Sequence, residues 1–178
     1  MDFKEFLNAI PKIKNIPLPA QESQFKMSPP FRKALIRRYE EKRKTARQAA
    51  VLAMVYPDNE FKTKLALILR NTYHGVHSAQ VGFPGGKVER EDPDLESTAL
   101  RETEEEIGVD RSSIKIIKEL TDVYIPPSNF NVRPFLGLCE FFPEFSKQDE
   151  EVRDIIQVPL EHLLSDERVV VEKVATSY

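Results

Sequence analysis

The chain has 178 residues, of which 40% are hydrophobic and 31% are charged, and its formal net charge is −3. This length and composition predict a single soluble globular domain with a sizeable core. The small negative charge argues against nucleic acid as a partner, because binding to a phosphate backbone depends on clustered basic residues.

Targeting signals, membrane-spanning segments and cysteines indicate the compartment of a protein. The N-terminus has no basic-then-apolar signal pattern, and no apolar run reaches membrane-spanning length. We therefore expect a cytoplasmic protein with no membrane partner. The single cysteine, Cys139, excludes a disulfide within the chain and lies in an apolar run, where we expect a small buried side chain.

Residues 1–25 are predicted to form an N-terminal helix and a proline-rich extension outside the main domain. Apolar residues recur there at helical spacing: Phe3, Phe6, Leu7 and Ile10. They predict an amphipathic helix over 2–10 that packs on the domain or on a second subunit, which leaves a homodimer open. The prolines that follow predict an extended connector: Pro11, Pro17 and Pro19.

Residues 26–178 are predicted to form the main domain, with mixed α and β structure. A weak pattern predicts a helix over 31–43, and a longer helix is expected from Asp94 or Leu95 to Ile107, with Gly108 as its left-handed cap. A helical turn is expected over 159–164, and a polar loop over 71–79. Apolar runs predict strands over 46–56, 64–70, 81–83, 114–123, 132–142, part of 149–156, and 169–174 as a strand or tail.

A basic segment precedes the first of these strands. Residues 26–47 contain nine cationic residues and two acidic ones: Lys26, Arg32, Lys33, Arg37, Arg38, Lys42, Arg43, Lys44 and Arg47, with Glu40 and Glu41. A polyanionic substrate would be attracted to such a segment. For most of these residues, a solvated helix or linker is the simpler interpretation.

The helix over 95–107 carries the most informative pattern. Glu102, Glu105 and Glu106 stand at i, i+3 and i+4, so they project from the same helical face. Like charges this close destabilise a helix unless a cation lies between them. Carboxylate oxygens on a rigid element suit Mg²⁺ or Mn²⁺, and Mg²⁺ often completes its shell with water and substrate phosphates. The pattern therefore predicts a divalent-metal site for phosphate chemistry.

A solvated acidic face is the alternative, and Glu104 is expected to be of that kind. The neighbours of the other three glutamates resemble the Nudix box of the Nudix hydrolases, G-x5-E-x7-R-E-U-x-E-E-x-G-U, where U is aliphatic. The matching residues are Gly86, Arg101, Glu102, Glu105, Glu106, Gly108 and Val109. The departures are Asp92 in place of the upstream glutamate, one extra residue before Arg101, and Thr103 at an aliphatic position expected to face the core. The resemblance implies an α+β fold, an α/β/α sandwich with a mixed sheet.

A narrower resemblance concerns the coenzyme A pyrophosphatase branch. Residues 77–86 are similar to its H-S-G-Q-V-x-F-P-G-G segment, and the extra loop residue and Asp92 are also features of that branch. Residues 26–32, 127–137 and 158–163 are similar too, so the likeness spans most of the chain. Ala79 and Leu69 depart from the residues usual in the branch.

Roles follow from the chemistry and the resemblance. Glu102, Glu105 and Glu106 are the predicted ligands of Mg²⁺ or Mn²⁺, and the resemblance adds the backbone carbonyl of Gly86. Arg101 is expected to orient a carboxylate, with Asp92 as its partner. The candidate catalytic residues are Glu105, Arg101 and Glu102. Glu105 is the candidate for sharing in proton removal from water, and the alternative base is a glutamate outside the box, Glu150 or Glu151.

The resemblance implies cleavage of the diphosphate of coenzyme A or acyl-coenzyme A, giving 3′,5′-ADP and (acyl-)phosphopantetheine. Two alternatives are a pyrophosphatase for another nucleoside diphosphate derivative, such as ADP-ribose or NADH, and a non-catalytic nucleotide-binding Nudix module. Candidate substrate contacts are His77, Ser78, Phe83, Ser128 and Phe130. Tyr124 and Phe135 could extend an aromatic wall with Phe83 and Phe130, although aromatic residues beside strands more often belong to the core.

Overall fold

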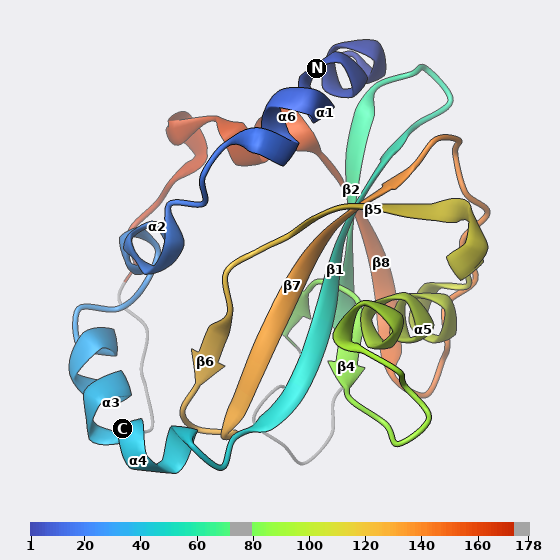
Figure 1. The fold of residues 1–178 in the computed structure, drawn as a ribbon. Coiled ribbons are helices and arrows are strands. Elements are labelled where there is room, and N and C mark those ends of the chain that lie inside the picture. Colours follow the sequence, from blue (N-terminus) through green and yellow to red (C-terminus); the bar gives the residue numbers. More distant parts are fainter. Residues whose placement is uncertain (72–79, 173–178) are drawn as a thin grey trace.

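The computed structural model describes residues 1–71 and 80–172 (Figure 1). Its strands are β1 (Arg47–Pro57), β2 (Thr63–Arg70), β3 (Val81–Gly82), β4 (Gly85–Lys87), β5 (Ile114–Glu119), β6 (Val123–Ile125), β7 (Phe130–Cys139) and β8 (Val152–Pro159). Its helices are α1 (Phe3–Asn15), α2 (Ala20–Lys26), α3 (Arg32–Arg38), α4 (Glu40–Arg43), α5 (Leu95–Ile107) and α6 (Leu160–Leu164), with 3-10 turns at η1 (Arg111–Ser113) and η2 (Asp166–Arg168).

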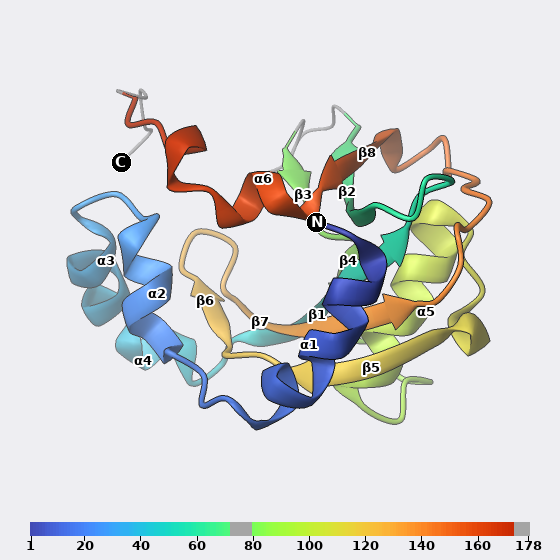
Figure 2. The ribbon, with the colours of Figure 1, turned by 90° about the horizontal axis from the view of Figure 1, so that it is seen from above.

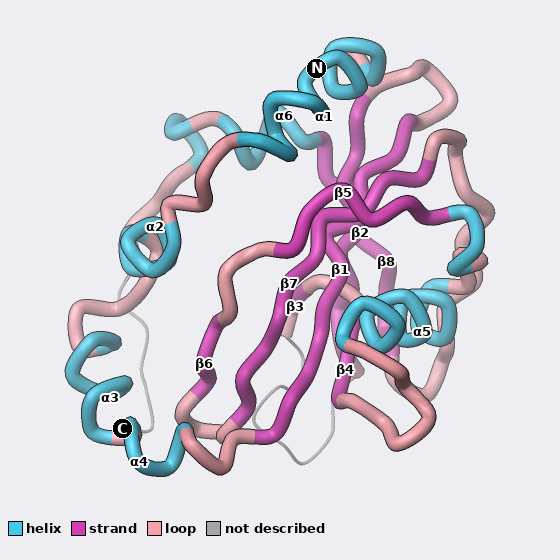
Figure 3. The backbone as a smooth tube through the Cα atoms, viewed as in Figure 1, coloured by secondary structure: helices cyan, strands magenta, loops and turns pink. Residues whose placement is uncertain are grey.

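The strands form one mixed sheet around β1 and β7. These two strands run parallel, with Arg47 opposite Phe130, whereas the other pairings are antiparallel. One edge of β1 changes partner along its length: β4 pairs with residues 49–51 and β2 with residues 55–57. The sheet therefore divides beside β4, and Figure 3 shows β4 next to α5 at this division.

Two cores cover the two faces of the sheet. Successive side chains of a strand point to opposite faces, so Leu52 and Met54 join the core beneath α5, whereas Ala53 and Val55 join the core that contains α1. Helices α2, α3 and α4 lie beyond β6, on the other side of the molecule from α5 (Figure 2). This arrangement confirms the predicted α+β fold with a mixed sheet between helices.

Helix α5 begins and ends where the sequence predicts. The Asp94 side chain accepts a hydrogen bond from the Ser97 N–H at 2.7 Å, which caps the first turn. Gly108 adopts φ +73° and donates its N–H to the Glu104 carbonyl. Thr103 is fully buried, as expected, and its hydroxyl donates to the Ala99 carbonyl.

The N-terminal helix is longer than its apolar pattern predicts. Helix α1 continues through Pro11 to Asn15, so the prediction of an extended connector from Pro11 is wrong. Proline removes one helical hydrogen bond, but Ile10 and Ile13 pack against the core on this face of the sheet and favour continuation. The short helix α2 was not predicted.

Other helix and strand boundaries differ from the predicted ones, because a break of one to three residues within an element gives only a weak signal in the sequence. Tyr39 separates α3 from α4 within the helix expected over 31–43, and the strand expected over 114–123 is divided into β5 and β6. Strand β4, which contains Gly85 and Gly86, was not among the predicted strands, and the described residues 169–172 form no strand. The loop predicted over 71–79 lies outside the described residues beyond Asn71. No helix in the ranges 1–71 and 80–172 is both long and apolar enough to cross a bilayer.

We expect Phe6→Ala to lower the free energy of unfolding by about 3 kcal/mol, because it removes a buried ring between α1 and the sheet. Phe61→Ala is the matched control, since this ring is 67% exposed. Chemical denaturation measures both. An unchanged midpoint for the Phe6 variant would support the proposed division into an extension (1–25) and a main domain (26–178), whereas the expected loss would show that both unfold together.

Candidate active site

Glu102, Glu105 and Glu106 of α5 line a cavity of about 290 Å³ beside β4. The other lining residues come from β4 and the turn after it, from α5, from the end of β2 and from the segment before β8: Gly85, Gly86, Lys87, Glu89, Arg101, Arg70, Gln148 and Glu151. Segments far apart in the sequence thus build one acidic cavity.

Glu106 is the most buried of the three carboxylates. One oxygen, Oε2, accepts a hydrogen bond from the Gly85 N–H at 2.7 Å, and the other, Oε1, lies 3.0 Å from Nη1 of Arg70. The Oε1 contact is an ion pair without hydrogen-bond geometry. Burial raises the pKa of Glu106 to about 7, while Arg70 and the Gly85 N–H oppose that rise.

Glu102 occupies space that only a glycine leaves free. A Cβ on Gly86 would lie 2.4 Å from Oε2 of Glu102, well inside contact distance. Burial raises the pKa of the Glu102 carboxyl, and Arg101, whose Nη1 lies 3.1 Å from Oε1, opposes the rise. The carboxylate is therefore packed directly against the main chain of β4.

Arg101 holds this acidic face together. Its Nε and Nη2 donate to the two carboxylate oxygens of Asp92, both at 2.9 Å, and Nη1 lies 2.9 Å from Glu105 Oε2. Nη2 also reaches the Lys87 carbonyl. The guanidinium holds the pKa of Asp92 well below its usual range. This bidentate pair is the partnership expected from the sequence.

The remaining glutamates differ in exposure and direction. The Glu105 side chain is 53% exposed at the mouth of the cavity. Glu104 pairs with Arg111 and does not line the cavity. Glu151 lines the cavity and Glu150 does not.

The donor set fits a divalent cation, although the carboxylates are held by arginines as they stand. Over the described ranges, no three acidic, histidine or cysteine side chains are close enough to share an ion. However, Oε1 of Glu106 has no hydrogen bond in this buried position, and Glu102 fills the space at Gly86 beside it. Hard oxygen donors of this kind suit Mg²⁺ or Mn²⁺.

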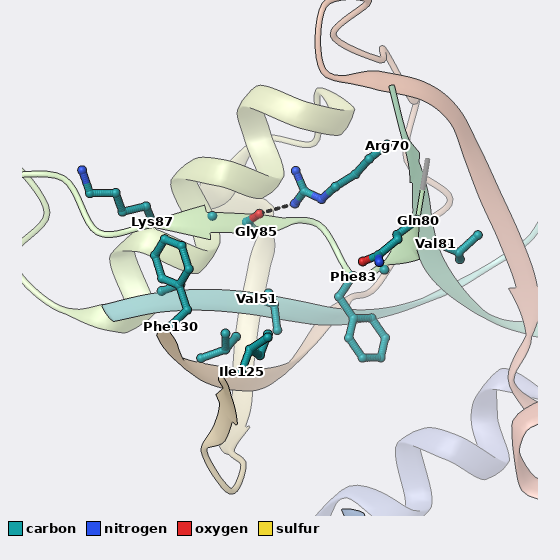
Figure 4. A pocket seen from close by; sticks show the side chains of 13 residues that line it. Val51, Arg70, Gln80, Val81, Phe83, Gly85, Lys87, Ile125 and Phe130 are labelled. Carbon is teal, nitrogen blue, oxygen red and sulfur yellow. Dashed lines mark hydrogen bonds between the residues drawn. The ribbon is translucent and has the colours of Figure 1, made fainter. Parts of the chain in front are cut away.

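A second, apolar cavity of about 280 Å³ lies beside the first. Its lining comes mainly from β1, β7 and the segment around β3 (Figure 4): Ala49, Val51, Gln80, Val81, Gly82, Phe83, Ile125, Phe130 and Val132. Four further residues line both cavities: Arg70, Gly85, Gly86 and Lys87. An organic group in the apolar pocket would therefore adjoin an anionic group near the glutamates.

Only some of the predicted substrate contacts line the apolar pocket. Phe83 and Phe130 line the apolar pocket. Ser128 is buried and is not part of the lining, and its carbonyl accepts a hydrogen bond from Arg47. Tyr124 and Phe135 are buried away from the pocket wall. His77 and Ser78 lie outside the described residues.

Arg70 was not anticipated. It ends β2, donates to the Gly85 carbonyl, and pairs with the buried Glu106. The available signal was a charged residue at the end of an apolar strand, but its partners are 15 and 36 positions away in the sequence. Only the folded sheet brings them together.

The sequence matches the NUDIX domain model over residues 46–175. The chain is 37% identical over 121 residues to the uncharacterized Nudix hydrolase NudL of Yersinia pestis, and the same figures hold for a NudL of Yersinia pseudotuberculosis. That match covers 68% of this chain and 59% of its relative. The chain belongs to the Nudix domain family. Hydrolases of this family act on pyrophosphate bonds and generally use divalent metal ions.

Solved structures share the fold. The Ap4A hydrolase of C. elegans, in a binary complex, superimposes with a TM-score of 0.54 at 19% identity, covering 66% of this chain and 83% of that one. The NUDIX domain of Shewanella oneidensis NrtR, complexed with ADP ribose, gives a TM-score of 0.52 at 19% identity, covering 67% and 76%. At this identity the likeness concerns the fold.

We expect Gly86→Ala to displace the Glu102 carboxylate and to lower the free energy of unfolding by about 1–3 kcal/mol, because the added methyl overlaps Glu102. Gly82→Ala is the matched control, since a Cβ there meets no atom within 4 Å. Thermal or chemical unfolding measures the difference. Equal stability of the two variants would contradict the close packing of Glu102 against β4.

Proposed function

We propose that this protein is a hydrolase that cleaves the diphosphate bond of a small nucleoside diphosphate derivative. The observation that carries the proposal is the junction of the acidic and apolar cavities at Arg70, Gly85, Gly86 and Lys87. A diphosphate at this junction would lie beside the glutamates of α5 while an attached organic group fills the apolar pocket.

The proposed metal ligands are Glu102, Glu105, Glu106 and the carbonyl of Gly86. A bound Mg²⁺ or Mn²⁺ would offset negative charge on the phosphoryl oxygens and lower the pKa of an attacking water. The chain supplies the rigid donors for this ion, because α5 is capped at both ends and Glu106 is fixed to β4.

Glu105 is the proposed proton acceptor for the attacking water. Its exposed carboxylate reaches the cavity from the same helical face as Glu102 and Glu106. Glu151 is the alternative base, since it lines the cavity from the segment just before β8. Arg101 is a positioning residue that orients Glu102 and Glu105 through its pair with Asp92. Arg70 presents a cation to the phosphates at the junction.

Within this class, we propose coenzyme A or an acyl-coenzyme A as the substrate. Support comes from the residues similar to the coenzyme A pyrophosphatase branch, including Asp92 and the extra residue before Arg101. The chain spans 59% of the length of the curated relatives it matches, so the activity of the whole protein is part of the proposal. A cytoplasmic location and a homodimer stay predictions from the sequence.

A substrate panel tests the proposal. We expect hydrolysis of coenzyme A with Mg²⁺ or Mn²⁺ and none after chelation, with phosphate-containing products identified by chromatography. The panel also contains ADP-ribose and NADH, and preferred turnover of either would replace coenzyme A while keeping the reaction class. Tight nucleotide binding without turnover of any panel member would favour the binding module.

We expect Glu105→Gln to lower kcat by at least about 100-fold while leaving thermal stability unchanged, because the side chain is exposed and its charge is removed from the cavity. Glu104→Gln is the matched control on the same helix, since Glu104 pairs with Arg111 outside the cavity. If Glu151→Gln is inactive and Glu105→Gln is active, the proton acceptor is Glu151.

A further inference from the structure

We propose that Arg47 and Lys87 form a second anion-binding subsite, which takes a phosphate monoester on the nucleotide part of the substrate. The inference rests on the proposed function and deepens it. It gives a binding role to two cationic residues that are not among the proposed metal ligands. It also names a chemical group that the substrate must carry in addition to its diphosphate.

Strand register places both cations at one end of the apolar pocket. Lys87 pairs with Ala49 across β4 and β1, and Arg47 stands two positions before Ala49 on the same face of β1. Arg47 also stands opposite Phe130 of β7. Figure 4 shows Lys87 next to Phe130 at one end of the pocket and Arg70 toward the other.

Local contacts fix the Arg47 guanidinium beside the pocket wall. Its central carbon lies 4.1 Å from the centroid of the Phe130 ring, a cation–π contact, and Nη2 donates to the Ser128 carbonyl at 3.0 Å. A guanidinium has five N–H donors, so these contacts hold it in place and leave donors for an anion. A preorganised arginine loses less side-chain entropy on binding a phosphate.

Arg47 and Lys87 differ from three other arginines of this region, each of which forms an ion pair with a carboxylate. Arg70 pairs with Glu106, Arg101 pairs with Asp92, and Arg133 pairs with Asp122. Within the part of the chain that the structure describes, neither Arg47 nor Lys87 forms an ion pair with a carboxylate. Their positive charge is therefore available to a ligand.

The position of Lys87 restricts the ligand chemistry. Because Lys87 lines both cavities, an anion bound by its ammonium group lies close to a diphosphate at the junction. A phosphate monoester on the same ribose as the diphosphate meets this requirement, since only a few bonds separate the two groups. Coenzyme A carries such a phosphate at the ribose 3′ position, whereas ADP-ribose and NADH lack it.

Equilibrium binding tests the subsite without turnover. Isothermal titration calorimetry would compare adenosine 3′,5′-bisphosphate, adenosine 2′,5′-bisphosphate and AMP on the wild-type protein. We expect the 3′,5′-bisphosphate to bind about tenfold or more tightly than AMP, because a charge-assisted contact to phosphate is worth about that factor. Tighter binding of the 2′,5′-bisphosphate would keep the subsite and reassign the ribose position.

The variants assign the preference to these side chains. Arg47→Gln and Lys87→Gln should each reduce the bisphosphate-to-AMP affinity ratio about tenfold, and Arg47→Lys should restore part of it. Arg38→Gln on α3 and Lys12→Gln on α1 are charge-matched controls at exposed positions and should leave the ratio unchanged. Equal ratios in all five proteins and the wild type would overturn the proposal.

Kinetics give a second readout. The ratio of kcat/KM for coenzyme A to that for dephospho-coenzyme A should exceed about ten in the wild type and fall about tenfold in Arg47→Gln, through KM. Equal kcat/KM for both substrates would refute the subsite while leaving the diphosphate hydrolase proposal intact. Absence of all diphosphate hydrolysis, with the 3′,5′-bisphosphate preference present and lost in the variants, would refute the activity and keep the subsite.

Discussion

A buried carboxylate determines the geometry around the cleft. Glu106 accepts the Gly85 N–H and faces Arg70, so one side chain ties α5 to β4 and to the end of β2. Its burial is unfavourable for a charge, and the opposite charge of Arg70 together with the hydrogen bond from the main chain offsets that cost. Because these partners come from three elements, the helix, the edge strand and the sheet are fixed relative to one another.

That fixed arrangement explains why the two cavities meet. Strand β4 pairs with only part of β1, and β2 pairs with the rest, so the sheet divides beside Gly85 and Gly86. The glutamates of α5 approach from one side, and the apolar pocket formed by β1 and β7 lies on the other. Glycine at position 86 permits the close approach, since any larger side chain would overlap Glu102.

The charged residues around the cleft have three different roles. Arg101 and Asp92 form a half-buried bidentate pair, and Arg101 also contacts Glu102 and Glu105. Glu105 and Glu151 line the acidic cavity and are exposed to solvent. Arg47 and Lys87 carry charge that no described carboxylate balances. This separation suits a substrate with more than one anionic group.

The sequence by itself predicted what depends on neighbours along the chain. Helix α5, its Asp94 and Gly108 caps, the shared face of its glutamates and the Arg101–Asp92 pair all follow from spacing within about 17 residues. The central strands were also predicted, because long apolar runs are strong local signals.

Tertiary structure decided what depends on contacts between distant segments. It carries α1 through Pro11, because the sheet offers an apolar surface to Ile10 and Ile13. It also brings Arg70 to Glu106 and stacks Arg47 on Phe130, contacts that join separate strands and helices. A local pattern specifies which residues share a face, but the partner of that face is set by strand pairing and packing across the whole chain.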